Sequence, residues 1–402
     1  MATAGVIFRP RRLPEAIWAV AGAAALVLFG LLPWSDARKA VGQGTDVYLF
    51  LIGMMLLAEL ARQEGLFDWL AAYATRKARG SARRLFALVY LVGILVTVFL
   101  SNDATAVVLT PAVYAAARAA RADPLPYLFI CAFIANAASF VLPISNPANL
   151  VIFGSHMPSL MHWLAAFALP SALSILATFV ALRITQRRAL AGAITGQIDL
   201  PPLPVGAGLA AGGIGVTALV LLAASALDLP LGLPTFLAGG LSAGLVLWRR
   251  RVPPWRLLRG VSWSVLPLVA GLFVLVAGVG RTGALERLTL ALQALAERSV
   301  DQAAWVAGLL SALACNLANN LPVGLVAGSI GQADVPAPIT NALLVGIDLG
   351  PNLSVTGSLA TILWLVALRR EGVHVGAWQF LRLGLIVTPP ALLLALAALS
   401  FR

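Results

Sequence analysis

Long apolar blocks constrain the fold of this chain more than any other feature. A transmembrane helix needs about 20 consecutive apolar residues, and the sequence contains many stretches of that order, among them 126–153 and 205–227. Only 11% of the 402 residues are charged, whereas a soluble domain carries about 25%. Helices satisfy their own backbone hydrogen bonds in lipid. The sequence therefore predicts an all-α integral membrane protein.

We expect nine membrane crossings joined by short polar loops. Two further apolar stretches, 85–117 and 302–334, are interrupted by polar residues. They predict re-entrant hairpins, because each half is short for a complete crossing. Two ordinary spans in either stretch give the same loop sides and stay an alternative. The nine crossings are expected at about 15–33, 45–61, 126–153, 158–184, 205–227, 232–248, 259–279, 337–367 and 378–399.

The basic residues orient these crossings. In the expected topology, 22 of the 28 lysines and arginines fall on one side of the membrane and 6 on the other. Positive charge marks the cytoplasmic side, so we expect the N-terminus in the cytoplasm. The net charge of +12 is spread over short loops and forms no separate basic domain. This distribution argues against nucleic acid as a partner and leaves the lipid bilayer as the surroundings.

The two halves of the chain share an order of helix, polar-tipped hairpin and broken helix. Matched residues recur at an offset that falls from 218 to 204. The pairs are Gly53 with Gly271, Gly65 with Gly283, Asn102-Asp103 with Asn319-Asn320, and Pro147 with Pro351. The first unit begins with an outward-to-inward helix and the second with the reverse, as in many secondary transporters. We predict an inverted-topology repeat, with a first repeat at 1–184, a linker plus connecting span at 185–230, and a second repeat at 231–402.

Four polar clusters lie at membrane depth, two at the hairpin tips and two inside spans that we expect to be discontinuous helices. Broken helices expose backbone N–H and C=O groups, and they occur where they face protein or a water-filled cavity. Amide and hydroxyl side chains can bind an uncharged polar solute. The expected substrate-binding residues are Asn102, Asp103, Thr105, Asn146, Asn149, Asn316, Asn319, Asn320, Asp348, Asn352, Thr356 and Ser358.

Asp103 and Asp348 stand out among these residues, because an ionisable group within a spanning segment is costly and marks a functional-site hypothesis. Burial disfavours the charged form of a carboxyl group, so either could bind and release a proton during a transport cycle. We therefore predict both as proton-coupling residues. The alternative is a neutral or Arg-paired carboxyl that only stabilises a helix break.

Other chemistries find little support in the sequence. The two lysines, Lys39 and Lys77, do not follow a glycine-rich loop, so no nucleotide-binding motif is present. Cys131 and Cys315 both lie in apolar segments, which fits buried thiols better than a disulfide or a zinc site. The three histidines share no ligand spacing. We expect no cofactor, no metal site and no enzymatic activity.

The polar clusters resemble motifs of a known family. The stretch 346–352 with 357–364 is similar to a signature of the ArsB-type arsenite/antimonite efflux permeases of the ion transporter superfamily, and 101–103 and 319–322 resemble its hairpin motifs. The resemblance covers about 45–370. It implies two inverted repeats and the export of arsenite or antimonite, as an uncharged trihydroxide, in exchange for protons. It also implies a bacterial cytoplasmic (inner) membrane. Because no nucleotide-binding motif is present, transport runs on an ion gradient, on the gradient of the solute or on a separate cytoplasmic ATPase subunit as partner.

Two other functions compete with this hypothesis. A sodium/proton antiporter of the same superfamily would use Asp103 and Asp348 as ion-binding carboxylates. A passive channel also accommodates inverted repeats, although hairpins and broken helices favour alternating access. No arginine lies in the four clusters, which argues against an obligatory dicarboxylate site. The residues themselves do not distinguish arsenite from another small polar solute.

Overall fold

The protein is helical throughout the part that the structure describes. The structure, a computed structural model, describes residues 15–154, 157–195, 200, 202–333 and 335–400. Within these residues, β pairing is limited to one isolated bridge between Ser81 and Ala193. Five helices are long and apolar enough to cross a membrane, and two bent helix pairs raise that number to seven. This architecture confirms the all-α membrane fold class.

The helices follow one another through two similar series. The first comprises α2 (Glu15–Leu28), α3 (Trp34–Gln43), α4 (Thr45–Gln63), α5 (Leu66–Ala78), α6 (Ala82–Phe99), α7 (Asn102–Ala104), η2 (Thr105–Leu109), α8 (Thr110–Ala119), α9 (Leu125–Ala137), η3 (Pro143–Ser145), α10 (Pro147–Phe153) and α11 (Leu160–Thr185). After η5 (Ala189–Ala191) and α12 (Val205–Ala226), the second comprises α13 (Gly232–Arg250), α14 (Pro254–Gly260), α15 (Val265–Gly280), α16 (Ala284–Arg298), α17 (Val300–Ala318), α18 (Asn320–Gly331), α19 (Ala337–Leu349), η6 (Gly350–Asn352), α20 (Leu359–Arg370) and α21 (Ala377–Ser400).

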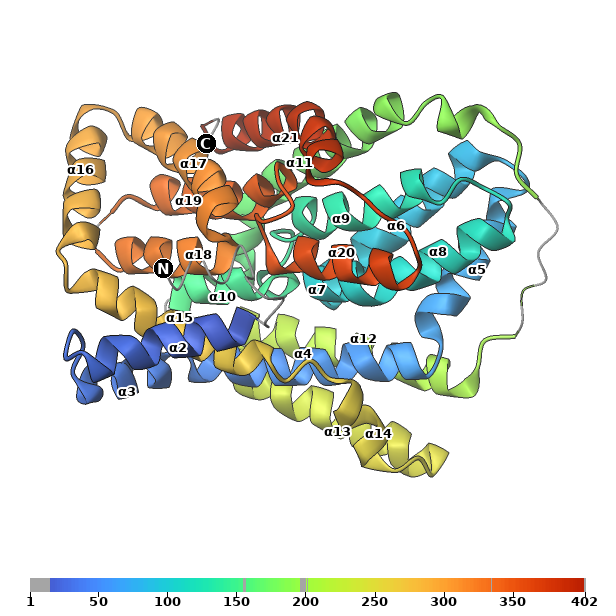
Figure 1. Cartoon of the computed structure of the whole chain (residues 1–402), viewed down its shortest axis with the longest axis horizontal. Coiled ribbons are helices and arrows are strands. Elements are labelled where there is room, and N and C mark those ends of the chain that lie inside the picture. Colours follow the sequence, from blue (N-terminus) through green and yellow to red (C-terminus); the bar gives the residue numbers. More distant parts are fainter. Residues whose placement is uncertain (1–14, 155–156, 196–199, 201, 334, 401–402) are drawn as a thin grey trace.

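Figure 1 shows these helices in two layers. One layer holds α2, α3, α4 and α12 to α15, in which α4 packs on α13 and α2 packs on α15. The other layer holds the two hairpins, the broken helices and the α11–α21 pair, which pack mainly on one another. The short helices α5 and α16 lie at opposite ends of the molecule (Figure 1).

The two series repeat each other in geometry. The bend between α3 and α4 is 46°, and the bend between α14 and α15 is 45°. Gly65 and Gly283 precede α5 and α16 with φ of 76° and 73°, a conformation that glycine adopts without a Cβ penalty. A Cβ at Gly53 would meet the backbone of α13, and one at Gly271 would meet the backbone of α2. The inverted-topology repeat predicted from these glycines is confirmed.

Both polar-tipped stretches turn back inside the protein. By length and composition alone, α6 and α17 could each cross a membrane. However, residues at the start of the returning helices, Asn102 and Asn320, line the same small internal cavity. The tips therefore meet near the middle of the molecule, and the prediction of two re-entrant hairpins is confirmed.

The broken helices are also present, but their register differs from the sequence alignment. Helices α9 and α19 each contain 13 residues, and α19 follows α9 by 212 residues. The predicted match of Pro147 with Pro351 was wrong. Pro147 begins α10, whereas Pro351 lies in a 3-10 turn before the second break. The structural counterpart of Asn146 is Ser358, because both are extended residues whose side chains cap the following half-helix.

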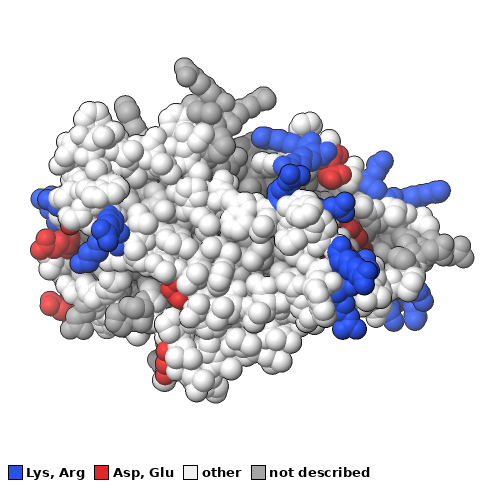
Figure 2. Space-filling view, turned by 90° about the horizontal axis from the view of Figure 1, so that it is seen from below, with Lys and Arg blue, Asp and Glu red and all other residues white. Residues whose placement is uncertain are grey.

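Charged residues gather at the two ends of the molecule. Figure 2 shows Lys and Arg at both ends of the long axis, with the larger group at one end and a mostly uncharged surface between them. This distribution is typical of a protein that spans a bilayer. The predicted cytoplasmic N-terminus concerns residues 1–14, which lie outside the described part of the chain.

Candidate functional site

The two hairpin tips and the first helix break meet at a central cavity of about 10 Å³. Its wall on the other side comes from α4 and α15, so the cavity lies between the two layers of Figure 1. A volume of 10–15 Å³ holds about one water molecule. The lining residues are Leu51, Asn102, Asp103, Asn146, Pro147, Val265, Val269, Asn320, Leu321, Leu359 and Ala360.

The first tip presents the one charged side chain of this cavity. Ser101 caps α7 by accepting a hydrogen bond from the Ala104 N–H at 3.2 Å, and Asn102 Oδ1 accepts from the Asp103 N–H at 2.9 Å. Thr105 pairs with Thr97 of α6 at 2.8 Å. Among the described residues, no hydrogen bond or ion pair engages the Asp103 carboxyl group. That group is therefore free to meet a solute.

The second tip presents an amide in place of the carboxyl group. Asn319 has a φ of 71°, and its side chain accepts a hydrogen bond from the Leu321 N–H at 3.4 Å. Asn320 is 3% exposed, and its Oδ1 has no hydrogen-bond partner within the described part of the chain. A buried unpaired carbonyl oxygen is costly. It therefore favours a guest that donates a hydrogen bond here.

The first helix break adds Asn146, which links the two repeats. Its Oδ1 accepts from the Ala148 N–H at 3.0 Å, while its Nδ2 donates to Asp348 Oδ1 at 2.6 Å. Asp348 is fully buried and does not line the central cavity. The two carboxyl groups predicted from the sequence therefore lie in different surroundings.

A second bond between the repeats involves a residue that the sequence analysis did not select. Asn136 Nδ2 donates to Asn352 Oδ1 at 2.9 Å, and Asn352 Nδ2 donates to the Phe133 carbonyl at 3.0 Å. Asn136 precedes Asp348 by 212 residues, so the two occupy the same place in their half-helices. Aligning α9 with α19 at that offset would have identified it.

The remaining predicted site residues do not line the central cavity, and several of them hold the breaks together. Asn149 Nδ2 donates to the Ser139 carbonyl at 2.9 Å. Asn316 Nδ2 donates to the Gly350 carbonyl at 3.0 Å, and Thr356 Oγ1 donates to the Asn316 carbonyl at 3.0 Å. Ser358 caps α20. Of the twelve residues predicted, four line the cavity: Asn102, Asp103, Asn146 and Asn320.

Two larger cavities flank the central one. The first has a volume of about 570 Å³ and shares Leu51, Asp103, Pro147 and Val265 with it. We call it the arginine vestibule, because it also contains Arg62, Arg259 and Arg370, together with Glu59 and Glu371. Asp103 therefore faces both this vestibule and the central cavity.

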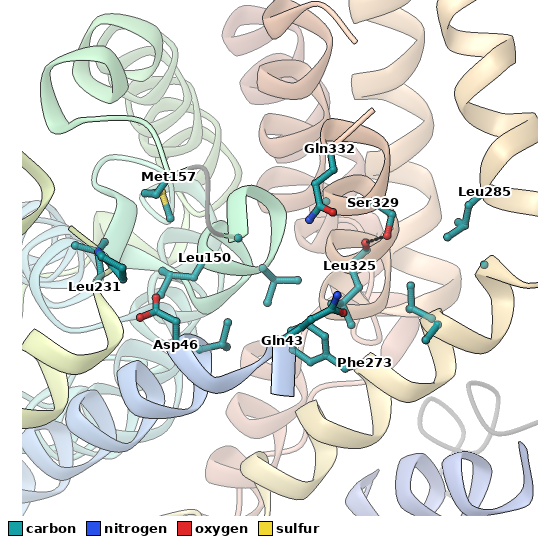
Figure 3. Close-up of a pocket in the computed structure, with 18 of the residues that line it drawn as sticks. Gln43, Asp46, Leu150, Met157, Leu231, Phe273, Leu285, Leu325, Ser329 and Gln332 are labelled. Carbon is teal, nitrogen blue, oxygen red and sulfur yellow. Dashed lines mark hydrogen bonds between the residues drawn. The ribbon is translucent and has the colours of Figure 1, made fainter. Parts of the chain in front are cut away.

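The second flanking cavity, the acidic vestibule, has a volume of about 610 Å³ and contains Asp46 and Asp228 but no basic residue. Figure 3 shows Gln43 and Asp46 on one side of it and Gln332 and Ser329 on the other. Along α4, Val47 of this vestibule lies one helical turn from Leu51 of the central cavity. A thin apolar layer thus separates the two spaces.

No group of three or more His, Cys, Asp or Glu residues suited to a metal ion occurs within the described ranges. The arrangement consists instead of one carboxyl group and three amides between two vestibules. Such a site can bind a small polar solute and exchange a proton, and the vestibules give it access toward both ends of the molecule. These features define a membrane transporter.

The comparisons with known proteins agree with this class. Residues 4–346 match the family model CitMHS, described as citrate transporter, and the chain belongs to this family. It is 27% identical to an arsenical pump membrane protein of Escherichia coli, over 99% of this chain and 96% of that protein. It is 29% identical to the arsenical pump membrane protein of Yersinia enterocolitica, over 98% and 95%. The resemblance to ArsB-type permeases is thereby confirmed.

A solved structure shares the fold. The YdaH transporter of Alcanivorax borkumensis, whose crystal structure was described as having an unusual topology, superposes with a TM-score of 0.59. The match covers 92% of this chain and 87% of that protein at 16% sequence identity. At this identity the likeness concerns the fold alone.

Proposed function

We propose that this protein exports arsenite or antimonite from the cytoplasm, as neutral trihydroxides, in exchange for protons. The full-length similarity to two arsenical pump membrane proteins supports the substrate. The composition of the central cavity carries the proposal, because it offers one carboxyl group, three amides and no basic side chain. A neutral triol both donates and accepts hydrogen bonds, and amides offer both functions in return.

The family name invites citrate as the substrate, and the cavity argues against it. A multiply charged anion needs basic partners when it leaves water. The arginines Arg62, Arg259 and Arg370 lie in the arginine vestibule, and none of them lines the central cavity. Asp103 would repel a carboxylate at the position where the hairpin tips meet.

For the proton exchange we propose Asp103 as the carrier. Its carboxyl group faces both the central cavity and the arginine vestibule, so it can contact a solute and also exchange a proton with water. Sodium/proton antiport is the second candidate, favoured by the same unpaired carboxyl group. The position of Asp103 also makes a passive channel the weaker alternative, because a channel has no need of a proton carrier.

We further propose that the vestibule with the arginines opens to the cytoplasm of a bacterial inner membrane and that the N-terminus lies on that side. The excess of arginine at that end supports this orientation. The two vestibules then correspond to the two sides between which the solute moves. A separate cytoplasmic ATPase subunit remains a partner to test by co-expression.

Arsenite resistance tests the proposal most directly. The wild-type chain, expressed in a bacterium that lacks arsenite export, should raise the tolerated arsenite concentration and reduce arsenic accumulation. Asp103→Asn should abolish both effects. Asp301→Asn makes the same chemical change at an exposed residue of the second hairpin and should behave like wild type. A well-expressed wild type that confers no resistance would contradict arsenite export.

Proteoliposomes separate the two candidate activities. Under the proposal, arsenite efflux from loaded vesicles accompanies proton uptake, and sodium alone moves no protons. Sodium-driven pH changes in the absence of arsenite would instead establish the antiporter. Saturable flux against an arsenite gradient would reject the channel.

A further inference from the structure

Asp348 is a buried carboxyl group with two polar side chains beside it, the amide of Asn146 and the hydroxyl of Ser139. It is the penultimate residue of α19, it is fully buried, and it lines neither the central cavity nor either vestibule. Its Oδ1 accepts a hydrogen bond from Asn146 Nδ2 at 2.6 Å. The bond joins the first half-helix of one repeat to the break of the other.

The partner of this bond, Asn146, has a fixed orientation. Its Oδ1 accepts from the Ala148 N–H and its Nδ2 donates to Asp348, and a flipped amide would place Nδ2 against the Ala148 N–H, where two donors face each other. A primary amide nitrogen carries two hydrogens. One is bound by Asp348, and Asn146 lines the central cavity. The second hydrogen is therefore available to an oxygen atom in that cavity.

The surroundings of Asp348 suit a neutral acid. Its Oδ2 has no hydrogen-bond partner among the described residues, and the three ion pairs found there join Arg62 with Glu59, Arg250 with Glu64 and Arg281 with Asp36. The neighbouring ionisable side chain is the thiol of Cys315, which is itself fully buried. An uncompensated carboxylate at membrane depth would be very costly.

We propose that Asp348 is a positioning residue that stays protonated throughout the transport cycle and orients Asn146 so that its second amide hydrogen is donated to an oxygen of the solute. Asp103 then exchanges protons alone. The inference rests on the proposed function for the identity of the solute. It gives Asp103 and Asp348 different roles, whereas the sequence predicted proton coupling for both.

Two substitutions distinguish positioning from proton exchange. Asp348→Asn keeps a carbonyl oxygen that can accept from Asn146, but it cannot bind and release a proton. In arsenite-loaded proteoliposomes with an internal pH dye, we expect it to keep the wild-type KM and the wild-type ratio of protons to arsenite. Asp348→Ala removes the acceptor, and we expect KM to rise roughly tenfold, as for the loss of one hydrogen bond, with the ratio unchanged.

The contrary result is equally clear. If Asp348→Asn loses proton-coupled arsenite export, as Asp103→Asn should, Asp348 is a carrier and the positioning role is overturned. Monodisperse elution and the melting temperature of the purified variants establish that each one is folded. Wild-type vesicles that fail to move arsenite would reject the proposed function. The protonation state of Asp348 is then tested by a second measurement that needs no transport.

That measurement is the infrared carbonyl stretch of protonated carboxyl groups in the purified protein. The wild-type minus Asp348→Asn difference spectrum should contain a protonated carboxyl band that stays unchanged between about pH 5 and 7, because burial disfavours the carboxylate. This result does not depend on the solute. A band that disappears as the pH rises within that range would overturn the proposal.

Discussion

The two hairpins have the same outline but are attached to the rest of the molecule in different ways. The tip of the second is bound to the break that follows it. Asn316 makes two of these bonds: its Nδ2 donates to the Gly350 carbonyl at 3.0 Å, and its Oδ1 accepts from Ser354 Oγ at 2.7 Å. The Asn320 N–H also donates to the Gly357 carbonyl at 2.9 Å. Near the first tip, one such bond to the following break is found among the described residues, from Ser145 Oγ to the Val98 carbonyl at 3.1 Å.

The first hairpin is held instead at its base. The chain after η5 crosses both of its ends, where the Ile194 N–H donates to the Gly80 carbonyl at 3.1 Å and the Thr195 N–H donates to the Ala120 carbonyl at 2.8 Å. Leu190 is buried beneath this crossing, which we call the strap (189–195). The two repeats share one architecture, but hydrogen bonds hold the first hairpin at its base and the second hairpin at its tip.

This difference coincides with the position of the charge. The loosely attached tip carries Asp103, whereas the tightly attached tip presents the amide Asn320 to the same cavity. A carboxyl group that gains and loses a proton changes the solvation it requires. A tip with few bonds to its surroundings can respond to that change at low cost, so the attachment and the chemistry fit each other.

The largest expected effect comes from exchanging the two tips' chemistry. Asp103→Asn should lower proton-coupled arsenite export by roughly 100-fold or more, the lower end of what a positioned proton-transfer group contributes. Adding Asn320→Asp restores a carboxyl group to the same cavity on the tightly attached tip. We expect the double variant to regain solute binding but little export. Initial efflux rates and equilibrium arsenite binding measure the two quantities.

Asn319→Asp is the control for this exchange, because Asn319 neighbours Asn320 but does not line the cavity. Combined with Asp103→Asn it should recover neither binding nor export. Full export by the Asp103→Asn, Asn320→Asp double variant would show that the attachment of the tip does not affect transport. It would contradict the link between loose attachment and proton exchange.

The next effect concerns the attachment of the second tip. Asn316→Ala removes side-chain hydrogen bonds to Ala312, Gly350 and Ser354, so we expect a loss of about 2–3 kcal/mol in unfolding free energy. Phe99 ends the corresponding helix α6 of the first hairpin and is 37% exposed. Phe99→Ala should cost far less. Melting curves of both variants in the same detergent test this, and equal losses would contradict the proposed difference.

The sequence predicted the framework well because its signals are local. Gly65 and Gly283 match at an offset of 218 and do occupy the same left-handed position before α5 and α16. Apolar length and interrupting polar residues likewise located both hairpins and both broken helices. Each of these signals is carried by neighbouring residues, so a single sequence suffices to find it.

Local sequence signals could not predict which residues of the two repeats contact each other. The Asn136–Asn352 and Asn146–Asp348 bonds join residues that are 216 and 202 apart, and their pairing depends on how the two repeats pack. Asn136 was missed because it stands alone in an apolar helix, without a neighbouring proline or second polar residue. The match at 204 failed because Pro147 and Pro351 resemble each other chemically while lying on opposite sides of their breaks.

A smaller effect is expected at the base of the first hairpin. Leu190→Ala should destabilise the strap by about 2 kcal/mol, at the lower end for a buried leucine. Because the strap crosses only this hairpin, amide hydrogen exchange should accelerate in 82–119 and stay unchanged in 300–331. Leu203→Ala, at a residue of the same linker that is 41% exposed, is the control. Faster exchange in both hairpins would mean that the strap stabilises the whole molecule.

The smallest effect tests where the two halves should be alike. Gly65→Ala and Gly283→Ala each place a Cβ on a left-handed residue, which costs about 1–2 kcal/mol. Neither position has another atom within 4 Å of that Cβ, so the backbone conformation is the sole source of the cost. Melting temperatures of the two variants should fall by the same amount. Unequal shifts would show that α5, which buries Leu66 and Phe67, and α16, which buries Leu292, contribute differently to stability, and the asymmetry would then extend beyond the hairpins.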